Sequence, residues 1–472
     1  MSHDRFAIRS ITQHTAISRR AAVSGVAAAG ATLALGLHAG AQTPEASPVT
    51  SPGASPAASP ISAGAGRYLF AADRTQTAIE VYSVPDGALA GRIEDITCAT
   101  HAGSLLLPDG RLLFGDQKNE EIVTLAVGAD GTPAIVDRVP ATFGSGAAWI
   151  AASPTLDYVT IGSLREGEHS QVLNIVEIAT FTNTAVEFAM NEDEELTAWL
   201  LNDPLNLYVA VGGQIKSYVL ADILASGSSD APLSTVEVEL GSHGGATDVL
   251  NDRIFYTTAP GTGFEVLDAS KGAVEYLTQV PWDVDGLTGG RNARPRVTGD
   301  GAFIFGLMTP GLDDPAQWAA TEVSIHVTDM AALTAVRRPV ANGNFGYRWG
   351  MNGAVALWAG YADAEMGTAY LIDANSTSGT FGTVVAEIAI PKPTNAAVAG
   401  KDFEGTDTYT TAVLAANDFG FISVNGDQVV QVIDLATHAI VGTFPIGMPM
   451  KNYDGYLAVV ETGIVPADVW GR

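Results

Sequence analysis

The chain has 472 residues, with 24 lysines and arginines against 52 aspartates and glutamates, so its formal net charge is −28. A surface this acidic repels polyanions, which argues against nucleic acid and anionic lipid as partners, although the same charge also serves solubility alone. The single cysteine, Cys98, excludes an internal disulfide framework, so a large domain must be held together by packing.

The amino terminus has the pattern of an export signal. A pair of arginines, Arg19-Arg20, precedes an uncharged, Ala-rich run at 21–37, and a small-residue motif ends at Ala41. This segment resembles the twin-arginine export signal of bacteria. Residues 21–23 lack the bulky apolar pair of that motif, so the general secretory route is the alternative. We expect an exported protein, in the periplasm, outside the cell or at the cell surface, with no transmembrane domain after export.

The predicted domain organisation has three parts. Residues 1–41 form the export signal, and residues 42–66 form a linker in which Pro, Ser and Ala dominate. A segment of this composition cannot bury a core and forms an extended, semi-rigid tether. Residues 67–472 then form one folded domain.

Short β-rich runs recur through residues 67–472, and almost no segment has helical periodicity. The eight clearest runs, which often end in an acidic residue, occur at 78–84, 121–127, 172–178, 214–220, 263–269, 322–330, 368–374 and 429–435. Each run follows another apolar run, and a third apolar run comes after it. A unit of about 40–60 residues with three or four strands is typical of a β-propeller blade.

The last unit, Gln428–Ile446, resembles the Tyr-Val-Thr-Asn-type repeat of a large superfamily of bacterial propellers. The resemblance implies an all-β fold and leaves function open, because that superfamily includes enzymes, metal proteins and binding scaffolds. The first unit lacks one strand, and the chain ends with a spare apolar run, Tyr456–Val460. We therefore predict an eight-bladed β-propeller closed by joining its N- and C-terminal strands, with seven blades and an insertion as the alternative.

A second repeat predicts a candidate metal site. The stretches 98–114 and 243–256 share an aligned histidine, glycine and arginine. The histidines are His101 and His243, and each precedes a run that we expect to line the central channel. Cys98 lies three residues before His101. Imidazoles and a thiolate gathered at the channel mouth are suitable ligands for zinc or copper. The alternative is that the cysteine packs as an apolar residue and the histidines form hydrogen bonds in turns.

Basic residues cluster at the start of two later units. Arg291, Arg294 and Arg296 lie within six residues, and Arg348-Trp349 has the equivalent position one unit later. Arginines beside a tryptophan can hold the carboxylate or phosphate of a small molecule by bidentate hydrogen bonds. The alternative is that these arginines pair with the surplus carboxylates of the domain.

Two tryptophans and three further histidines have structural interpretations. Trp149 and Trp199 have similar positions at the starts of two neighbouring units, where each is either an aromatic wall for a small ligand or a packing wedge between blades. His169, His326 and His438 fall in predicted loops or outer strands, so we expect them at the surface.

The histidines and the Arg294-Pro-Arg296 segment are similar to the pattern of periplasmic zinc metallochaperones, whose propellers collect histidines around the channel. The histidine-rich loops of those carriers are missing here. The sequence therefore predicts an exported transition-metal-binding propeller, with zinc or copper held by Cys98, His101 and His243.

Two other classes of function stay open. The sequence contains no Gly-x-Ser-x-Gly, Cys-x-x-Cys-His or His-Glu-x-x-His motif, which disfavours several routes to catalysis. Propeller enzymes nevertheless assemble their sites from scattered residues, so a lactonase-like or dehydrogenase-like enzyme acting on a small molecule is one alternative. A scaffold that binds a protein partner is the other.

Overall fold

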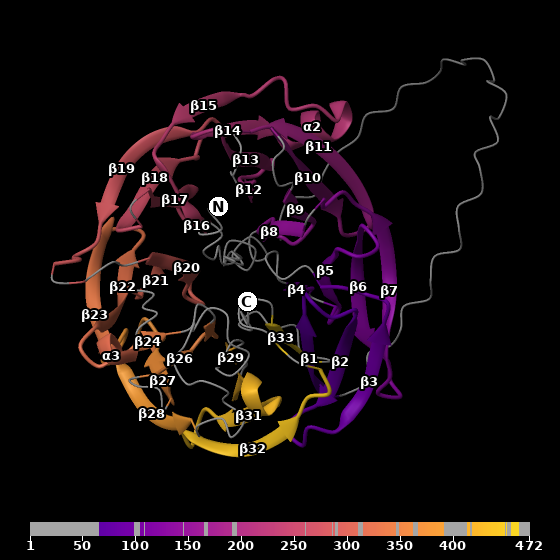
Figure 1. Ribbon diagram of the computed structural model, residues 1–472. Helices are drawn as coiled ribbons and strands as arrows, with labels where there is room; N and C mark the ends of the chain where they lie inside the picture. Colours follow the sequence, from indigo (N-terminus) through magenta and orange to yellow (C-terminus); the bar gives the residue numbers. More distant parts are fainter. Residues whose placement is uncertain are drawn as a thin grey trace, which may run out of the picture.

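Figure 1 shows a computed structural model of the chain as a closed ring of sheets seen along its axis. The structure describes residues 66–98, 104–107, 109–144, 146–164, 169–190, 196–259, 261–285, 287, 291–309, 315–345, 349–361, 367–390, 413–415, 418–448, 450 and 455–461. The predicted export signal and all but the last residue of the predicted linker lie outside these ranges.

Eight antiparallel sheets, the blades, stand around the axis, and this confirms the predicted eight-bladed propeller. The innermost strands of blades 1 to 8 are, in order, β33 (Gly455–Glu461), β4 (Ser104–Leu106), β8 (Gly146–Ala152), β12 (Thr197–Leu201), β16 (Leu240–Asp248), β20 (Arg291–Val297), the pair β24 (Asn344–Phe345) and β25 (Gly350–Met351), and β29 (Val413–Ala415). The second strands are β1 (Arg67–Asp73), β5 (Leu112–Asp116), β9 (Tyr158–Leu164), β13 (Asn206–Val211), β17 (Arg253–Thr258), β21 (Phe303–Thr309), β26 (Val355–Tyr361) and β30 (Phe419–Val424).

The outer half of each blade follows the same order. The third strands are β2 (Ala78–Ser83), β6 (Glu121–Val127), β10 (Ser170–Glu177), β14 (Gln214–Val219), β18 (Gly263–Asp268), β22 (Glu322–Asp329), β27 (Gly367–Asp373) and β31 (Val429–Asp434). The fourth strands are β3 (Leu89–Glu94), β7 (Pro133–Pro140), β11 (Thr182–Ala189), β15 (Ser234–Glu237), β19 (Glu275–Pro281), β23 (Thr334–Asn342), β28 (Val384–Ile390) and β32 (Ala439–Pro445). The short helices α2 (Leu220–Ser226) and α3 (Pro315–Trp318) and the 3-10 turn η1 (Asn425–Asp427) lie between strands.

Each of the eight predicted β-rich runs overlaps a third strand, and in several of them an aspartate at the end of the strand caps the next turn. The Asp434 carboxylate accepts hydrogen bonds from the backbone N–H groups of Ala436 and Thr437, at 2.9 and 2.7 Å. Asp268 and Asp329 do the same in their blades. Since these bonds stabilise the ionised carboxylate, the bonds from Thr437 hold the pKa of Asp434 below its usual value. The acidic ending is therefore a turn signal.

The two ends of the described ring complete one blade, as predicted. β33 pairs with β1 along its whole length, from Arg67 opposite Glu461 to Asp73 opposite Gly455. The innermost strand of blade 1 thus comes from the C-terminal end of the ring, while its other three strands come from the N-terminal end. This pairing covers the inner edge of β1, which would otherwise be the unpaired edge of a three-stranded sheet.

One apolar cluster fills each of the eight boundaries between neighbouring blades. Between blades 4 and 5, for instance, the rings of Trp199 and Tyr256 meet edge to face with centroids 5.4 Å apart. Second and third strands have a blade on either side, so β13 is buried at every position. Fourth strands face solvent on the outside, so exposure alternates along strands such as β32.

A buried polar network reinforces the boundary at which the ring closes. Glu80 of β2 is 3% exposed, and its carboxylate accepts hydrogen bonds from the Tyr82 hydroxyl and from the Gly447 backbone N–H at 2.8 Å. Arg92 pairs with the other carboxylate oxygen, also at 2.8 Å. Gly447 lies between β32 and β33, so this network ties blade 1 to the link from blade 8.

We predict that Glu80→Ala lowers the free energy of unfolding by about 1–3 kcal/mol, because the buried Tyr82 hydroxyl loses its acceptor and the Gly447 N–H keeps only the Tyr82 oxygen. Glu94→Ala is the matched control, since Glu94 pairs with the same Arg92 but its side chain is 66% exposed. That control should cost less than about 1 kcal/mol. Urea unfolding of the three proteins is the measurement, and equal losses in both variants would contradict the role of the network.

Candidate functional site

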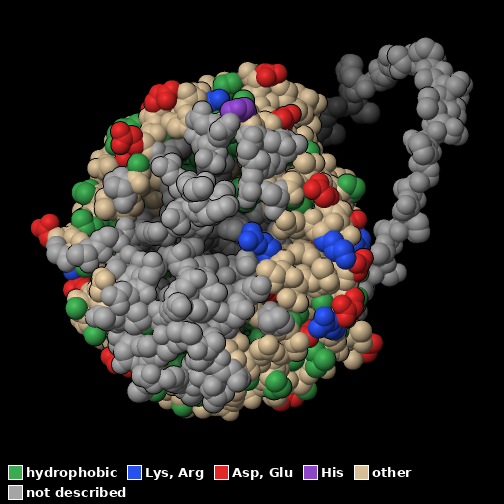
Figure 2. All heavy atoms as spheres, in the orientation of Figure 1, with side chains coloured by type: hydrophobic (Ala, Val, Ile, Leu, Met, Phe, Trp, Pro, Cys, Tyr) green, Lys and Arg blue, Asp and Glu red, His purple; other side chains and the backbone are tan. Residues whose placement is uncertain are grey.

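Cys98 and the starts of two strands that contain predicted site residues lie at one end of the ring. Because neighbouring strands are antiparallel, the links between blades and the turns between second and third strands lie at the same end, here called the crossover face. Cys98 and His101 belong to the link between β3 and β4. β16 and β20, which contain His243 and Arg294, begin at this face. In Figure 2, which shows one face of the ring, most of the visible described carboxylates lie around the rim, and a basic side chain lies close to the middle.

Cys98 is packed in the apolar cluster between blades 1 and 2. Its side chain is 3% exposed, and the cluster also contains Phe70, Phe114 and Tyr456. Its backbone forms a bridge with Asp116 at the end of β5. These surroundings are those of a small apolar core residue.

The other two predicted metal ligands have no described side chains. His101 lies outside the described residues, and His243 is described only through its backbone in β16. Across the described part of the chain, no group of three or more His, Cys, Asp or Glu side chains is arranged to hold a metal ion. A metal site would therefore need side chains that are not described, such as those of His101 and His243.

The backbone around His243 forms a wide bulge in the innermost strand of blade 5. Leu240 and Gly245 pair with Thr258 and Tyr256, so five steps along β16 match two steps along β17. A Cβ atom on Gly245 would lie 2.2 Å from the Phe255 carbonyl oxygen. A Cβ atom on Gly241 would lie 2.4 Å from the carbonyl oxygen of Thr258, at the end of β17. Bulges redirect side chains and are frequent beside functional sites. The glycines near His243, noted in the sequence, thus permit a close approach of two strands.

We predict that Gly245→Ala lowers the free energy of unfolding by about 1–3 kcal/mol, because the added methyl group collides with the backbone of β17. Gly379→Ala is the matched control, since a Cβ atom there meets nothing within 4 Å. Chemical unfolding checks this difference. If both variants have the same stability as the parent protein, the bulge does not require a glycine at position 245.

The basic segment of β20 joins two blades. Arg296 is 5% exposed, its Nη2 donates a hydrogen bond to the Trp349 carbonyl oxygen at 3.0 Å, and its guanidinium lies 5.4 Å from the Trp349 ring centroid. Trp349 itself is 1% exposed. The side chain of Arg294 is not described, and Arg348 lies outside the described residues. Arg296 and Trp349 therefore contact each other at the boundary of blades 6 and 7.

The tryptophans at the starts of blades 3 and 4 pack inside the ring. Trp149 of β8 is 4% exposed and packs against Leu164, and Trp199 of β12 meets Tyr256 of blade 5. The sequence allowed either an aromatic wall for a small ligand or a packing wedge between blades. The contact of Trp199 with Tyr256 of the next blade supports the packing wedge.

The expectation that His326 lies at the surface is wrong. Its side chain is fully buried and stacks on Trp282, with ring centroids 4.6 Å apart and planes 12° apart. Its Nε2 lies 3.3 Å from the Ser324 hydroxyl. β22 is a third strand and is covered by the neighbouring blade, which the sequence pattern did not reveal. Burial, aided by the positive charge of Arg337, lowers the pKa of His326 to about 4. His438, in contrast, is exposed as expected.

This histidine makes stability depend on pH. In the unfolded chain its pKa is about 6.5, so between about pH 6.5 and 4 the unfolded state binds a proton that the folded state does not. We predict that stability falls as pH decreases through this window, by about 3 kcal/mol from this group, and then levels off. His326→Phe should reduce that dependence and His438→Asn should not. Urea midpoints from pH 8 to 4 check this, and identical slopes in all three proteins would refute it.

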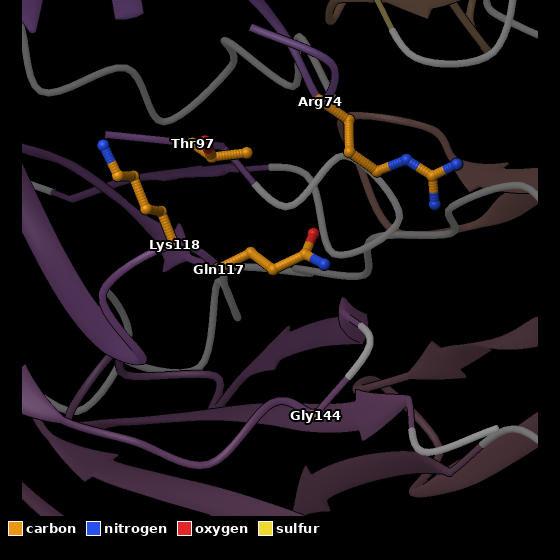
Figure 3. A pocket seen from close by; sticks show the side chains of 5 residues that line it. All are labelled: Arg74, Thr97, Gln117, Lys118 and Gly144. Carbon is orange, nitrogen blue, oxygen red and sulfur yellow. The ribbon is translucent and has the colours of Figure 1, made fainter. Parts of the chain in front are cut away.

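The structure also contains a pocket that the sequence did not predict. Its volume is about 410 Å³, and Arg74, Thr97, Gln117, Lys118 and Gly144 line it. Figure 3 shows the side chains of Arg74 and Gln117 extending to one side and that of Lys118 to the other. Four short pieces of chain contribute to it, so no local motif could have revealed it.

Comparison with solved structures shows the same fold in other proteins. AztD from Citrobacter koseri matches with a TM-score of 0.58 at 12% identity, over 85% of this chain and 100% of AztD. Its apo form matches with a TM-score of 0.58 at 11% identity, over 85% and 100% of the two chains. The dihydro-heme d1 dehydrogenase NirN in complex with DHE matches with a TM-score of 0.54 at 13% identity, over 84% of this chain and 75% of NirN. Identities this low establish the fold alone.

No protein-family profile matches the chain, and no curated protein matches its sequence. Among the described residues, no helix is both long enough and apolar enough to span a membrane. The fold is therefore established as an eight-bladed β-propeller, and function must be argued from the site.

Proposed function

We propose that this protein is an exported binding propeller that holds a transition metal ion, zinc or copper, at the channel mouth on its crossover face. The export part rests on the paired arginines and the Ala-rich run at the amino terminus. The metal part rests on His101 and His243, which occupy equivalent positions in the repeat of blades 2 and 5. Neutral imidazole is a common ligand for both metals.

The observation that carries the metal proposal is the bulge of β16. A strand that lines the channel interrupts its pairing at the histidine, between two glycines that cannot carry side chains. An interruption of this kind redirects a side chain from the blade toward the channel. The NirN propeller was solved in complex with DHE, so ligand binding is compatible with this fold.

Cys98 has a separate part in the proposal. A thiolate beside His101 would add a soft ligand and favour zinc or copper over calcium or magnesium. Its apolar surroundings favour packing instead. Two histidines alone would leave coordination positions open for water or a further ligand, which suits a site that must release its metal.

We predict that purified protein binds zinc or copper and that His101→Ala and His243→Ala each lower the retained metal at least about tenfold, because each removes one of few ligands. His438→Ala is the control, since His438 is exposed in the turn after β31. Elemental analysis after dialysis, together with titration calorimetry, is the measurement.

Cys98→Ala separates ligation from packing in the same experiment. Lost metal with unchanged stability assigns the thiolate as a ligand, whereas retained metal with lower stability assigns it to the core. Equal metal content in the parent protein and both histidine variants would contradict the proposed function.

A further inference from the structure

We propose that the pocket between blades 1, 2 and 3 binds a small molecule through a carboxylate or phosphate group, with Arg74 and Gln117 as the contacting side chains. The pocket lies on the crossover face, because its lining comes only from links between blades and from turns between second and third strands. Its volume of about 410 Å³ lies in the range of small-molecule sites. This proposal does not rest on the proposed metal site, although Thr97 of the lining directly precedes Cys98.

The charge of the lining is the first argument. Acidic residues outnumber lysines and arginines by 52 to 24 in the chain, yet the lining contains one arginine, one lysine and no acidic residue. The net negative charge of the chain repels an anion, whereas two cationic side chains line this pocket. Arginine binds an oxyanion through two parallel N–H groups, and the Gln117 amide can add another donor.

The second argument is that hydrogen bonds to buried carboxylates hold the backbone of the basic residues in place. Asp73, which is 1% exposed, accepts hydrogen bonds from the Thr75 backbone N–H at 2.8 Å and its hydroxyl at 2.6 Å. These bonds fix the turn between β1 and β2, which contains Arg74. A site whose framework is already ordered loses less entropy on binding.

Asp116 has the same position in blade 2 and is fully buried. It accepts hydrogen bonds from the backbone N–H groups of Thr97 and Lys118, at 3.0 and 3.1 Å, and from the Asn119 amide at 2.6 Å. The Gln117 N–H donates to the Thr97 carbonyl oxygen at 2.9 Å. Both carboxylates are therefore occupied within the framework, and three lining residues are joined to one another.

The arginine and the lysine have different parts in this site. Lys118 forms an ion pair with the exposed Asp95, and its ammonium extends away from Arg74 in Figure 3. Arg74 and the Gln117 amide extend to the same side. Gly144 donates its N–H to Glu120 at 3.2 Å, so this neighbouring acid is held by the link between blades 2 and 3. Arg74 and Gln117 thus bind the oxyanion, and Lys118 contributes charge at a distance.

The test is titration calorimetry at low salt with three probes: succinate, citrate and inorganic phosphate. The parent protein should bind at least one of them saturably, and sodium chloride should weaken the binding. Arg74→Gln should weaken it at least about tenfold and Gln117→Glu at least as much, because the second change adds a repelling carboxylate of equal size. Lys118→Gln should weaken it only about two- to threefold.

Lys271→Gln is the charge-matched control, because Lys271 is a 71% exposed residue of blade 5 and should not affect binding. All variants should unfold at the temperature of the parent protein, and binding should survive His243→Ala, which separates this site from the metal proposal. Binding of carboxylates only, or of phosphate only, supports the site and assigns its ligand class. No saturable binding of any probe, or equal affinity in Arg74→Gln and Lys271→Gln, would overturn it.

Discussion

Packing between the faces of adjacent blades is the interaction on which the rest of this structure depends. Each sheet is narrow and has two apolar faces, so no blade can bury its own surface. The eight blades bury these faces against one another by lying face to face around an axis, with one apolar cluster at every boundary. The arrangement is complete only when the last boundary closes, which the pairing of β1 with β33 and the Glu80 network achieve.

The same constraint explains where function can reside. The second and third strands are committed to packing, so a residue such as His326 of β22 is buried between blades. Trp199 of the innermost strand β12 and Cys98 of the link before β4 are also buried between blades. Side chains free to meet a ligand must come from the innermost strands and from the connections at the ends of the ring. Both proposed sites follow this rule: His243 belongs to the innermost strand β16, His101 precedes β4 in the sequence, and the basic pocket is built from links and turns.

Much of the fold could be predicted from the sequence because it repeats. Third strands buried on both faces give continuous apolar runs, and the aspartate that caps the next turn marks their ends, as at Asp434. The unpaired strands at the two ends also predicted the closure correctly. His326 was misplaced, because periodicity within one strand cannot show that Trp282 of the preceding blade covers it.

The sites were less predictable than the fold. Arg296 and Trp349 belong to neighbouring repeats, but neither their contact nor their burial could be predicted from the sequence. The basic pocket had no signal at all, because Arg74 and Lys118 stand in separate blades and become neighbours only when the ring forms. Repeats thus indicate which positions are equivalent, whereas burial and charge in three dimensions decide what each position does.

Anomalous X-ray diffraction from crystals of the metal-loaded protein, recorded at the zinc and copper absorption edges, tests the proposed function most directly. We expect an anomalous peak at the channel mouth on the crossover face, within bonding distance of the imidazoles of His101 and His243. No peak in the channel, or a peak bound only by other side chains, would contradict the metal-binding function and leave the propeller fold unaffected.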